Sequence, residues 1–425
     1  MNVQEQYSKK EYLASFIVAY VASLKGLNQL LGTILNKSDG IMVMNLVLLL
    51  PLIALHFFIS DKGSNLNLNK KSLLFVYYIV GIIVVHKYAH RTSSVTYEEL
   101  IVLVFIPIYL SFYKIDVEKV LRYVTYFSLL ILPFSGAFFQ SQATREFETI
   151  GMTTSYNTLI FITAAALHFC YYKKDANIVL WGAYAVNIMY LAKVLTLGSR
   201  GPFIAIVVFF VLLILHQFDE NGKLERHTFK KMFVTVAVGF LVMYVVSNLE
   251  EVLRSLDEWL RSMGIEVSSI SKSIHKLEQG DLSNGRSAIL DFTKEGIREH
   301  YLVGNGVSTM LHNSNYTMAY PHNIFYQLWY DLGVVVSIPL FYLILKAAKK
   351  TLFDASLDKN HAVILMFMFT LSIPRLCMSS QLWVDIPFWF LIMYTITPNV
   401  YKVNEEDKDE ENSEEELIGY EKKLL

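Results

Sequence analysis

The chain has 425 residues, of which 54% are hydrophobic and 18% charged, and its 37 basic residues nearly balance its 38 acidic ones. Its mean hydropathy is positive, and its apolar residues fall in long uninterrupted blocks rather than in periodic stripes. This composition predicts a polytopic membrane protein, and a net charge of −1 gives no reason to expect a nucleic-acid partner.

Blocks long enough to cross the hydrocarbon of a bilayer recur along the whole chain. They predict about 12 transmembrane helices. The predicted spans are 12–36, 41–59, 72–90, 98–113, 118–139, 153–172, 177–197, 202–218, 231–248, 324–347, 360–377 and 381–401. The expected fold class is therefore an all-α polytopic membrane protein.

The short loops differ in charge, and this difference predicts the orientation. Lysine pairs such as Lys70–Lys71, Lys173–Lys174 and Lys230–Lys231 fall in alternate loops, which are expected to face the cytoplasm. Both chain ends are then cytoplasmic. Residues 1–247 hold nine spans, 248–323 form a large extracytoplasmic loop, 324–401 hold three more spans, and 402–425 form an acidic cytoplasmic tail.

The large loop has an organisation of its own. Apolar residues from Leu249 to Met263 recur at three- and four-residue spacing, which predicts an amphipathic helix that Gly264 ends. A polar linker through Gly285 and a second helical stretch, 286–300, are expected to follow. The sequence Gly304-Asn305-Gly306 then turns the chain toward the next span.

The sequence Gly198-Ser199-Arg200-Gly201-Pro202 lies between two spans, on the predicted outer side. Two glycines permit tight turns, and Pro202 suits the first position of the following helix. Free backbone N–H groups, a helix N-terminus and a guanidinium together can hold a phosphate. The alternative is an interfacial arginine that only extends to lipid headgroups.

His322 lies in Pro321-His322-Asn323, before the tenth predicted span. A histidine there can act as a general base near neutral pH, and the alternative is an ordinary surface or capping histidine. That second interpretation also holds for His300 and His312. Arg286 is either a second anion ligand or a solvated helix residue, and spacing does not separate the two.

Several segments, in their order along the chain, resemble one family. Gly198-Ser199-Arg200-Gly201 is similar to the Ser-Arg-Gly signature of the superfamily of O-antigen ligases and Wzy-type O-antigen and capsular polysaccharide polymerases. The further segments that carry the resemblance are Arg145-Glu146-Phe147 with Gly151 and Asn157, Asn284-Gly285-Arg286-Ser287, Gly304-Asn305-Gly306, His322-Asn323 and Asp331-Leu332-Gly333. The chain departs from the pattern at His300-Tyr301, where His-Pro is usual, and at Asp331, where Glu is more frequent.

The resemblance implies a GT-C-like glycosyltransferase that acts on undecaprenyl-diphosphate-linked glycans at the extracytoplasmic face of a bacterial inner (plasma) membrane. It implies Arg200, Arg286 and Arg145 as diphosphate ligands and His322 as the base that activates the acceptor hydroxyl. Ser199, Gly201 and Asn323 are expected to support them. One displacement inverts the anomeric centre, and arginines can stabilise a leaving diphosphate in place of a metal ion.

We expect neither a metal nor another cofactor. The first outer loop, 36–40, holds a single acidic residue, and the neighbours Glu98 and Glu99 point to different faces of a helix.

The predicted function is a polymerase that transfers a glycan to another lipid-linked repeat unit, in the synthesis of lipopolysaccharide O-antigen, capsule or exopolysaccharide. The alternatives are a ligase that transfers the glycan to lipid A core or to protein and, from another class, a lipid-linked glycan transporter. A chain-length regulator and a flippase are the expected protein partners.

Overall fold

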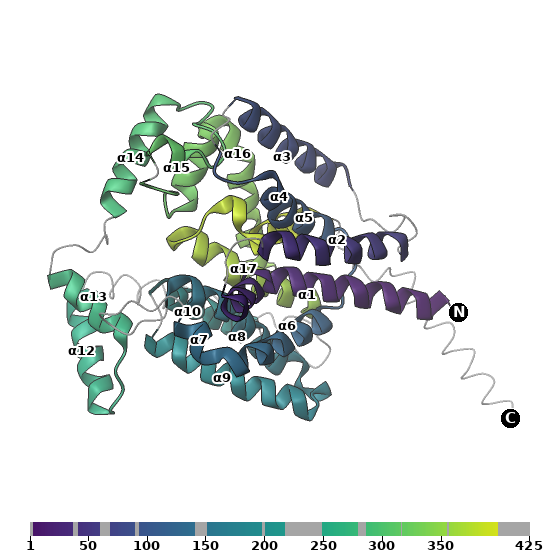
Figure 1. Cartoon of the computed structure of the whole chain (residues 1–425), viewed down its shortest axis with the longest axis vertical. Helices are drawn as coiled ribbons and strands as arrows, with labels where there is room; N and C mark the ends of the chain where they lie inside the picture. The colour runs from purple at the N-terminus through teal and green to yellow at the C-terminus, as the bar shows by residue number, and fades with distance from the viewer. Residues whose placement is uncertain are drawn as a thin grey trace.

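The computed structural model describes residues 3–36, 41–59, 69–89, 93–140, 151–197, 200–216, 249–278, 286–315, 317–354 and 357–397. Within these ranges the regular secondary structure is helical throughout, as predicted (Figure 1). The ninth predicted span, 231–248, and the acidic tail lie outside them.

Each of the other predicted spans coincides with one or more helices. The first half of the chain forms α1 (Val3–Leu35), α2 (Ile41–Ile59), α3 (Lys70–Ala89), α4 (Tyr97–Leu100), α5 (Ile106–Leu110), α6 (Val117–Ile131), α7 (Ser135–Gln140), α8 (Met152–Tyr172), α9 (Ile178–Leu197) and α10 (Arg200–Leu215). The second half forms α12 (Leu249–Ser262), α13 (Ser268–Glu278), α14 (Arg286–Glu299), α15 (Met310–Asn313), α16 (Ile324–Phe353), α17 (Lys359–Met378) and α18 (Ile386–Ile396).

Five stretches among the described residues are both long and apolar enough to cross a membrane. They are Glu11–Leu35, Val117–Gln140, Ile178–Leu197, Ile324–Phe353 and Lys359–Met378, and shorter apolar helices accompany them. The chain is therefore a helical membrane protein.

Prolines interrupt two spans that the hydropathy pattern had shown as continuous. Pro107 has no N–H to donate, and the chain before it, Ile101–Phe105, widens into a π-helical turn in which Ile106 N–H bonds to the Ile101 carbonyl. Pro133 lies in a 3₁₀ turn between α6 and α7. The fourth and the fifth predicted spans are thus each a series of short helices.

The core of the bundle is formed around α17, which lies at the centre of Figure 1. This helix packs against α8, α10, α16 and α18, and nearly all of its residues from His361 to Leu376 are buried. By contrast, α3 lies at the edge and leaves large apolar side chains such as Leu74 and Tyr77 exposed. Exposed apolar surface of this kind suits contact with lipid.

The large loop contains both predicted helices, as α12 and α14. Gly264 ends the first of them with a φ of 75°, and the N–H of Ile265 bonds back to the Leu260 carbonyl. The prediction of a polar linker after Gly264 was wrong in part, because residues Ser268–Glu278 form α13. This helix packs against α12, and the pair projects from the bundle (Figure 1). Its apolar residues, among them the buried Ile270, are too few in a polar segment to stand out in the sequence.

The helix α16 is broken at Gly333, where φ is 71° and ψ is 172°. A break at this depth frees backbone groups that need partners. The loop after α14 supplies them: Asn305 N–H bonds to the Tyr330 carbonyl (2.7 Å), Gly306 N–H to the Asp331 carbonyl (3.0 Å), and Val334 N–H to the Tyr301 carbonyl (2.9 Å). The loop and the broken helix therefore form one unit.

Glycine is required on both sides of this contact. A Cβ at Gly304 would lie 2.5 Å from the carbonyl oxygen of Asp331, and a Cβ at Gly333 would lie 2.4 Å from the carbonyl carbon of Leu302. Both glycines also have positive φ. Larger residues would separate this loop from α16. The loop connects α14 to the segment that contains His322.

Candidate active site

Arg286 is the first residue of α14, and its side chain connects the large loop to the bundle. Its Nη1 donates a hydrogen bond of 2.9 Å to the carbonyl oxygen of Met378, the last residue of α17. Gly296, further along α14, packs against the ring of Tyr330 in α16, where an added Cβ would lie 2.4 Å from a ring carbon. These contacts place the guanidinium of Arg286 at the end of the central helix.

His322 lies in the short segment between the loop and α16. Its ring centroid is 4.3 Å from that of Tyr320, and its Nδ1 is buried without a hydrogen-bond partner among the described residues. The backbone of His322 has a φ of 58°, and the side chain of the next residue, Asn323, caps α16 by accepting from the N–H groups of Phe325 and Tyr326. The predicted supporting residue Asn323 thus fixes the helix that follows the histidine.

Arg286 and His322 are close enough to influence each other. Burial, and then the positive charge of Arg286, lower the pKa of His322 to about 4. The imidazole is therefore neutral at neutral pH, which is the form that can accept a proton. Two residues predicted from separate motifs thus belong to one site.

Arg375 belongs to the same site and was not among the predicted ligands. It lies near the end of α17, its guanidinium carbon is 5.1 Å from the ring centroid of Tyr156 in α8, and its Nε is buried without a hydrogen-bond partner among the described residues. No carboxylate in the described part of the chain lies within 4.0 Å of Arg375 or of Arg286. The sequence signal was present, because Arg375 interrupts an apolar span, but no motif contained it.

Two tyrosines interact electrostatically with both guanidinium groups. The charges of Arg375 and Arg286 both act on Tyr156 and on Tyr320. Burial raises the pKa of Tyr320, and the two arginines oppose that rise. The hydroxyl of Tyr320 donates to the carbonyl oxygen of Ser379 at 3.1 Å, which ties the segment before His322 to the end of α17.

A second layer of charge lies deeper in the bundle. Lys25 of α1 and Arg375 both interact electrostatically with Asp385, a fully buried carboxylate that caps α18 through Phe388 N–H. Lys25 and Asp385 offset each other, so the positive charges of Arg286 and Arg375 remain. This region therefore has a surplus of positive charge in a low-dielectric setting, which favours an anionic ligand.

The predicted Arg200 motif is described only in part. α10 begins at Arg200, so Pro202 is the third helical residue rather than the first; its missing N–H still costs nothing there. Gly201 is buried against Tyr156, with an added Cβ only 2.2 Å from the tyrosine hydroxyl. The first turn of α10 therefore borders the site. The side chain of Arg200, and Ser199 and Arg145 as a whole, lie outside the described residues.

Asp331 has a structural place beside the site. Its Oδ2 accepts from the indole N–H of Trp383 (2.7 Å) and from the side-chain amide of Gln327 (3.3 Å), and all three side chains are buried. This contact connects α16 to the turn before α18. In the described part of the chain, no three His, Cys, Asp or Glu side chains are grouped so that they could hold a metal ion.

Residues 185–341 match the family model described as O-antigen ligase. This segment covers less than half of the chain, and its match supports the resemblance to the superfamily of O-antigen ligases and Wzy-type polymerases. The matched segment runs from α9 through α10 and the large loop into α16, so it includes Arg200, Arg286 and His322. No curated protein and no solved structure matches the chain.

The similarity of this segment to O-antigen ligases supports an activity in polysaccharide synthesis at a membrane. It does not separate polymerases from ligases. Arg375 and Tyr156 lie outside the matched segment and reach the site only through the fold.

Proposed function

We propose that the chain is a metal-independent, inverting polysaccharide polymerase that uses an undecaprenyl-diphosphate-linked glycan as donor and another lipid-linked repeat unit as acceptor. The observation that carries this proposal is the pair of guanidinium groups of Arg286 and Arg375. They act on the same two tyrosines, have no carboxylate within 4.0 Å among the described residues, and lie next to a neutral His322. Arginine binds diphosphate oxygens through parallel N–H groups.

The reaction needs two tasks from these residues. The acceptor hydroxyl attacks the anomeric carbon of the donor while the bond from that carbon to the diphosphate oxygen breaks, and the leaving diphosphate keeps the bonding electrons. Arg286 and Arg375 stabilise the charge that develops there, with Arg200 and Arg145 as further proposed ligands. His322 accepts the proton of the hydroxyl.

Net charge supports the diphosphate as the bound group. Lys25 and Asp385 offset each other, and the two positive charges of Arg286 and Arg375 that remain are of the size that a diphosphate diester compensates. Because the cluster is buried, these charges are screened little by salt. We assign the acceptor to a lipid-linked unit rather than to lipid A core because this acceptor occurs with or without an outer membrane.

The test is incubation of the purified protein with a single lipid-linked repeat unit from its source strain, with products separated by length. We expect a ladder of products, undiminished by excess EDTA. His322→Ala, Arg286→Ala and Arg375→Ala should each lower the rate about 10²-fold or more. Arg375→Lys should also lower it, because the charge stays but the planar fork is lost.

The matched control is Arg298→Ala, which removes an exposed arginine from the same helix as Arg286. It should keep wild-type activity. A product that forms only after lipid A core is added would replace the polymerase by a ligase. Full activity of the His322→Ala variant would remove the proposed base, and transfer of the intact lipid across vesicles without glycan extension would favour a transporter.

A further inference from the structure

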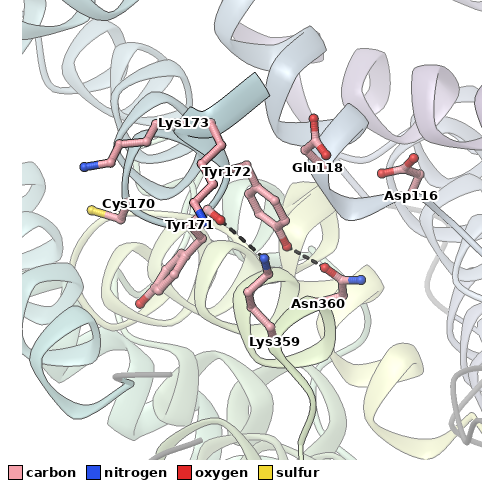
Figure 2. Close-up of a pocket in the computed structure, with 9 residues that line it drawn as sticks. Asp116, Glu118, Cys170, Tyr171, Tyr172, Lys173, Lys359 and Asn360 are labelled. Atoms are coloured by element: carbon pink, nitrogen blue, oxygen red, sulfur yellow. Dashed lines mark hydrogen bonds between the residues drawn. The ribbon is translucent and has the colours of Figure 1, made fainter. Parts of the chain in front are cut away.

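A pocket of about 420 Å³ lies at the other end of the bundle from the candidate active site. It is formed where α8 ends and where α6 and α17 begin (Figure 2). Arg375, near the far end of α17, is 16 residues from Lys359 in this pocket, which is about 24 Å along a helix. The pocket and the candidate active site are therefore separate.

The acidic residues that line the pocket are each paired with a base. Asp116 forms an ion pair of 2.7 Å with Lys119, and Glu118 pairs with Arg122, one turn further along α6. Their negative charge is thus compensated from within the same helix.

The basic residues that line the pocket have no such compensation. Lys173, Lys174 and Lys359 have no carboxylate within 4.0 Å among the described residues. Lys359 extends into the pocket, where its ammonium donates to the carbonyl oxygen of Tyr171 at 3.3 Å and lies 4.3 Å from the ring centroid of Tyr172 (Figure 2). An ammonium has three N–H groups, so this bond leaves donors for a ligand. The pocket as a whole has an excess of positive charge.

The surroundings of the pocket are those of a membrane surface. Phe169 and Trp181 are in edge-to-face contact, 39% and 50% exposed, and the ammonium of Lys173 lies 5.2 Å from the Phe169 ring centroid. Exposed aromatic rings next to lysines are typical of the level of lipid headgroups. Apolar surface for acyl chains therefore adjoins cationic surface for a phosphate.

We propose that this pocket binds the phosphate of an anionic membrane phospholipid, held by Lys359, Lys173 and Lys174, with the acyl chains along Phe169 and Trp181. Basic pockets between transmembrane helices suit such headgroups. Free phosphate is also an anion, but it has no acyl chains that could contact the aromatic surface. The lipid is therefore the expected occupant. Bound lipid would hold together the ends of α6, α8 and α17, the last of which carries Arg375 at its other end.

A native cysteine can report whether the pocket is occupied. It has two cysteines, and Cys170 lines the pocket with an exposed side chain. The test is the rate at which N-ethylmaleimide modifies Cys170 in full-length protein that carries Cys377→Ser and has been delipidated in neutral detergent. Dioleoylphosphatidylglycerol should slow modification several-fold. The same concentrations of dioleoylphosphatidylcholine, or of inorganic phosphate, should leave the rate unchanged.

Charge removal then tests which residues are responsible. Lys173→Gln with Lys174→Gln changes two exposed side chains and should weaken protection, and adding Lys359→Gln should abolish it. The matched control, Lys346→Gln with Lys349→Gln, removes two lysines from the end of α16 and should keep full protection. Equal protection by phosphatidylcholine, protection by inorganic phosphate alone, or unchanged protection in the lysine variants would each overturn the proposal.

Discussion

His322 is held in a left-handed backbone conformation that residues with a Cβ seldom adopt. This conformation costs on the order of 1–2 kcal/mol, so its neighbours must stabilise it. The ring packs on Tyr320, whose hydroxyl bonds to Ser379, and the following Asn323 caps α16. These contacts fix the direction of the imidazole, as the proposed role of His322 as a base requires.

The charge of Arg286 gives this site a testable pH dependence. Burial and Arg286 lower the pKa of His322 to about 4, so the free enzyme keeps a neutral base at all pH values above about 4 and loses it as pH falls through that value. Arg286→Gln removes the positive charge while the burial remains. The pKa should then rise, but stay below the ordinary value near 6.5.

The measurement is kcat/KM against pH in the ladder assay, for the wild type and for the residual activity of Arg286→Gln. The quantity compared is the pH of the acid limb, where kcat/KM falls. The limb should move to higher pH in the variant. Arg298→Gln is the control and should leave it in place. An acid limb that does not move would mean that Arg286 does not act on the titrating group, or that the group is not His322.

Motifs in the sequence pointed to two residues of the candidate site and did not point to others. Arg286 and His322 follow recognisable strings, and the structure brings them together. Arg375 and Tyr156 stand in apolar helices without a motif, and Arg286 contacts α17 over a separation of 92 residues. Sequence spacing reports neighbours on one element and not those on different elements. The side-chain positions of Arg200 and Arg145 remain predictions.

At the scale of elements, two sequence segments that carry the family resemblance form the two sides of one contact. Gly304-Asn305-Gly306 was predicted as a turn, and Asp331-Leu332-Gly333 as part of a span. In the structure the turn bonds to the carbonyl groups that the break at Gly333 frees. A sequence shows that each glycine permits an unusual backbone, but it does not show that the loop and the broken helix complete each other.

The contact between α10 and α8 gives a prediction at this scale. Gly201→Ala places a Cβ 2.2 Å from the hydroxyl oxygen of Tyr156, so it should destabilise the protein by about 1–3 kcal/mol and lower its melting temperature in detergent. Tyr156→Phe removes that oxygen and should restore most of the loss in the double variant. Gly182→Ala, where nothing lies within 4 Å of the added Cβ, is the matched control and should change little. A double variant no more stable than Gly201→Ala would place the clash elsewhere.

For the whole molecule, hydropathy predicted where helices lie but not how continuous they are. Eleven of the predicted spans coincide with helix, yet α18 has only 11 residues and α16 is broken. A buried helix in a large bundle can be shorter than the hydrocarbon layer and need not be apolar throughout, because protein rather than lipid surrounds its ends. Hydropathy averages over windows, so single-residue breaks at Gly333 or Pro107 disappear in it.

The orientation in the membrane decides on which side the candidate active site and the proposed lipid pocket lie. The excess of lysines in alternate loops predicts that α12 lies outside the membrane and the end of α16 in the cytoplasm. In a variant with Cys170→Ser and Cys377→Ser, Ser262→Cys and Lys349→Cys each put a thiol on an exposed position of one of these segments. In intact spheroplasts a membrane-impermeant maleimide should label Ser262→Cys, and it should label Lys349→Cys only after the membrane is opened. The reverse pattern would place the His322 and Arg286 side of the bundle in the cytoplasm, where a polymerase of exported lipid-linked units could not meet its donor.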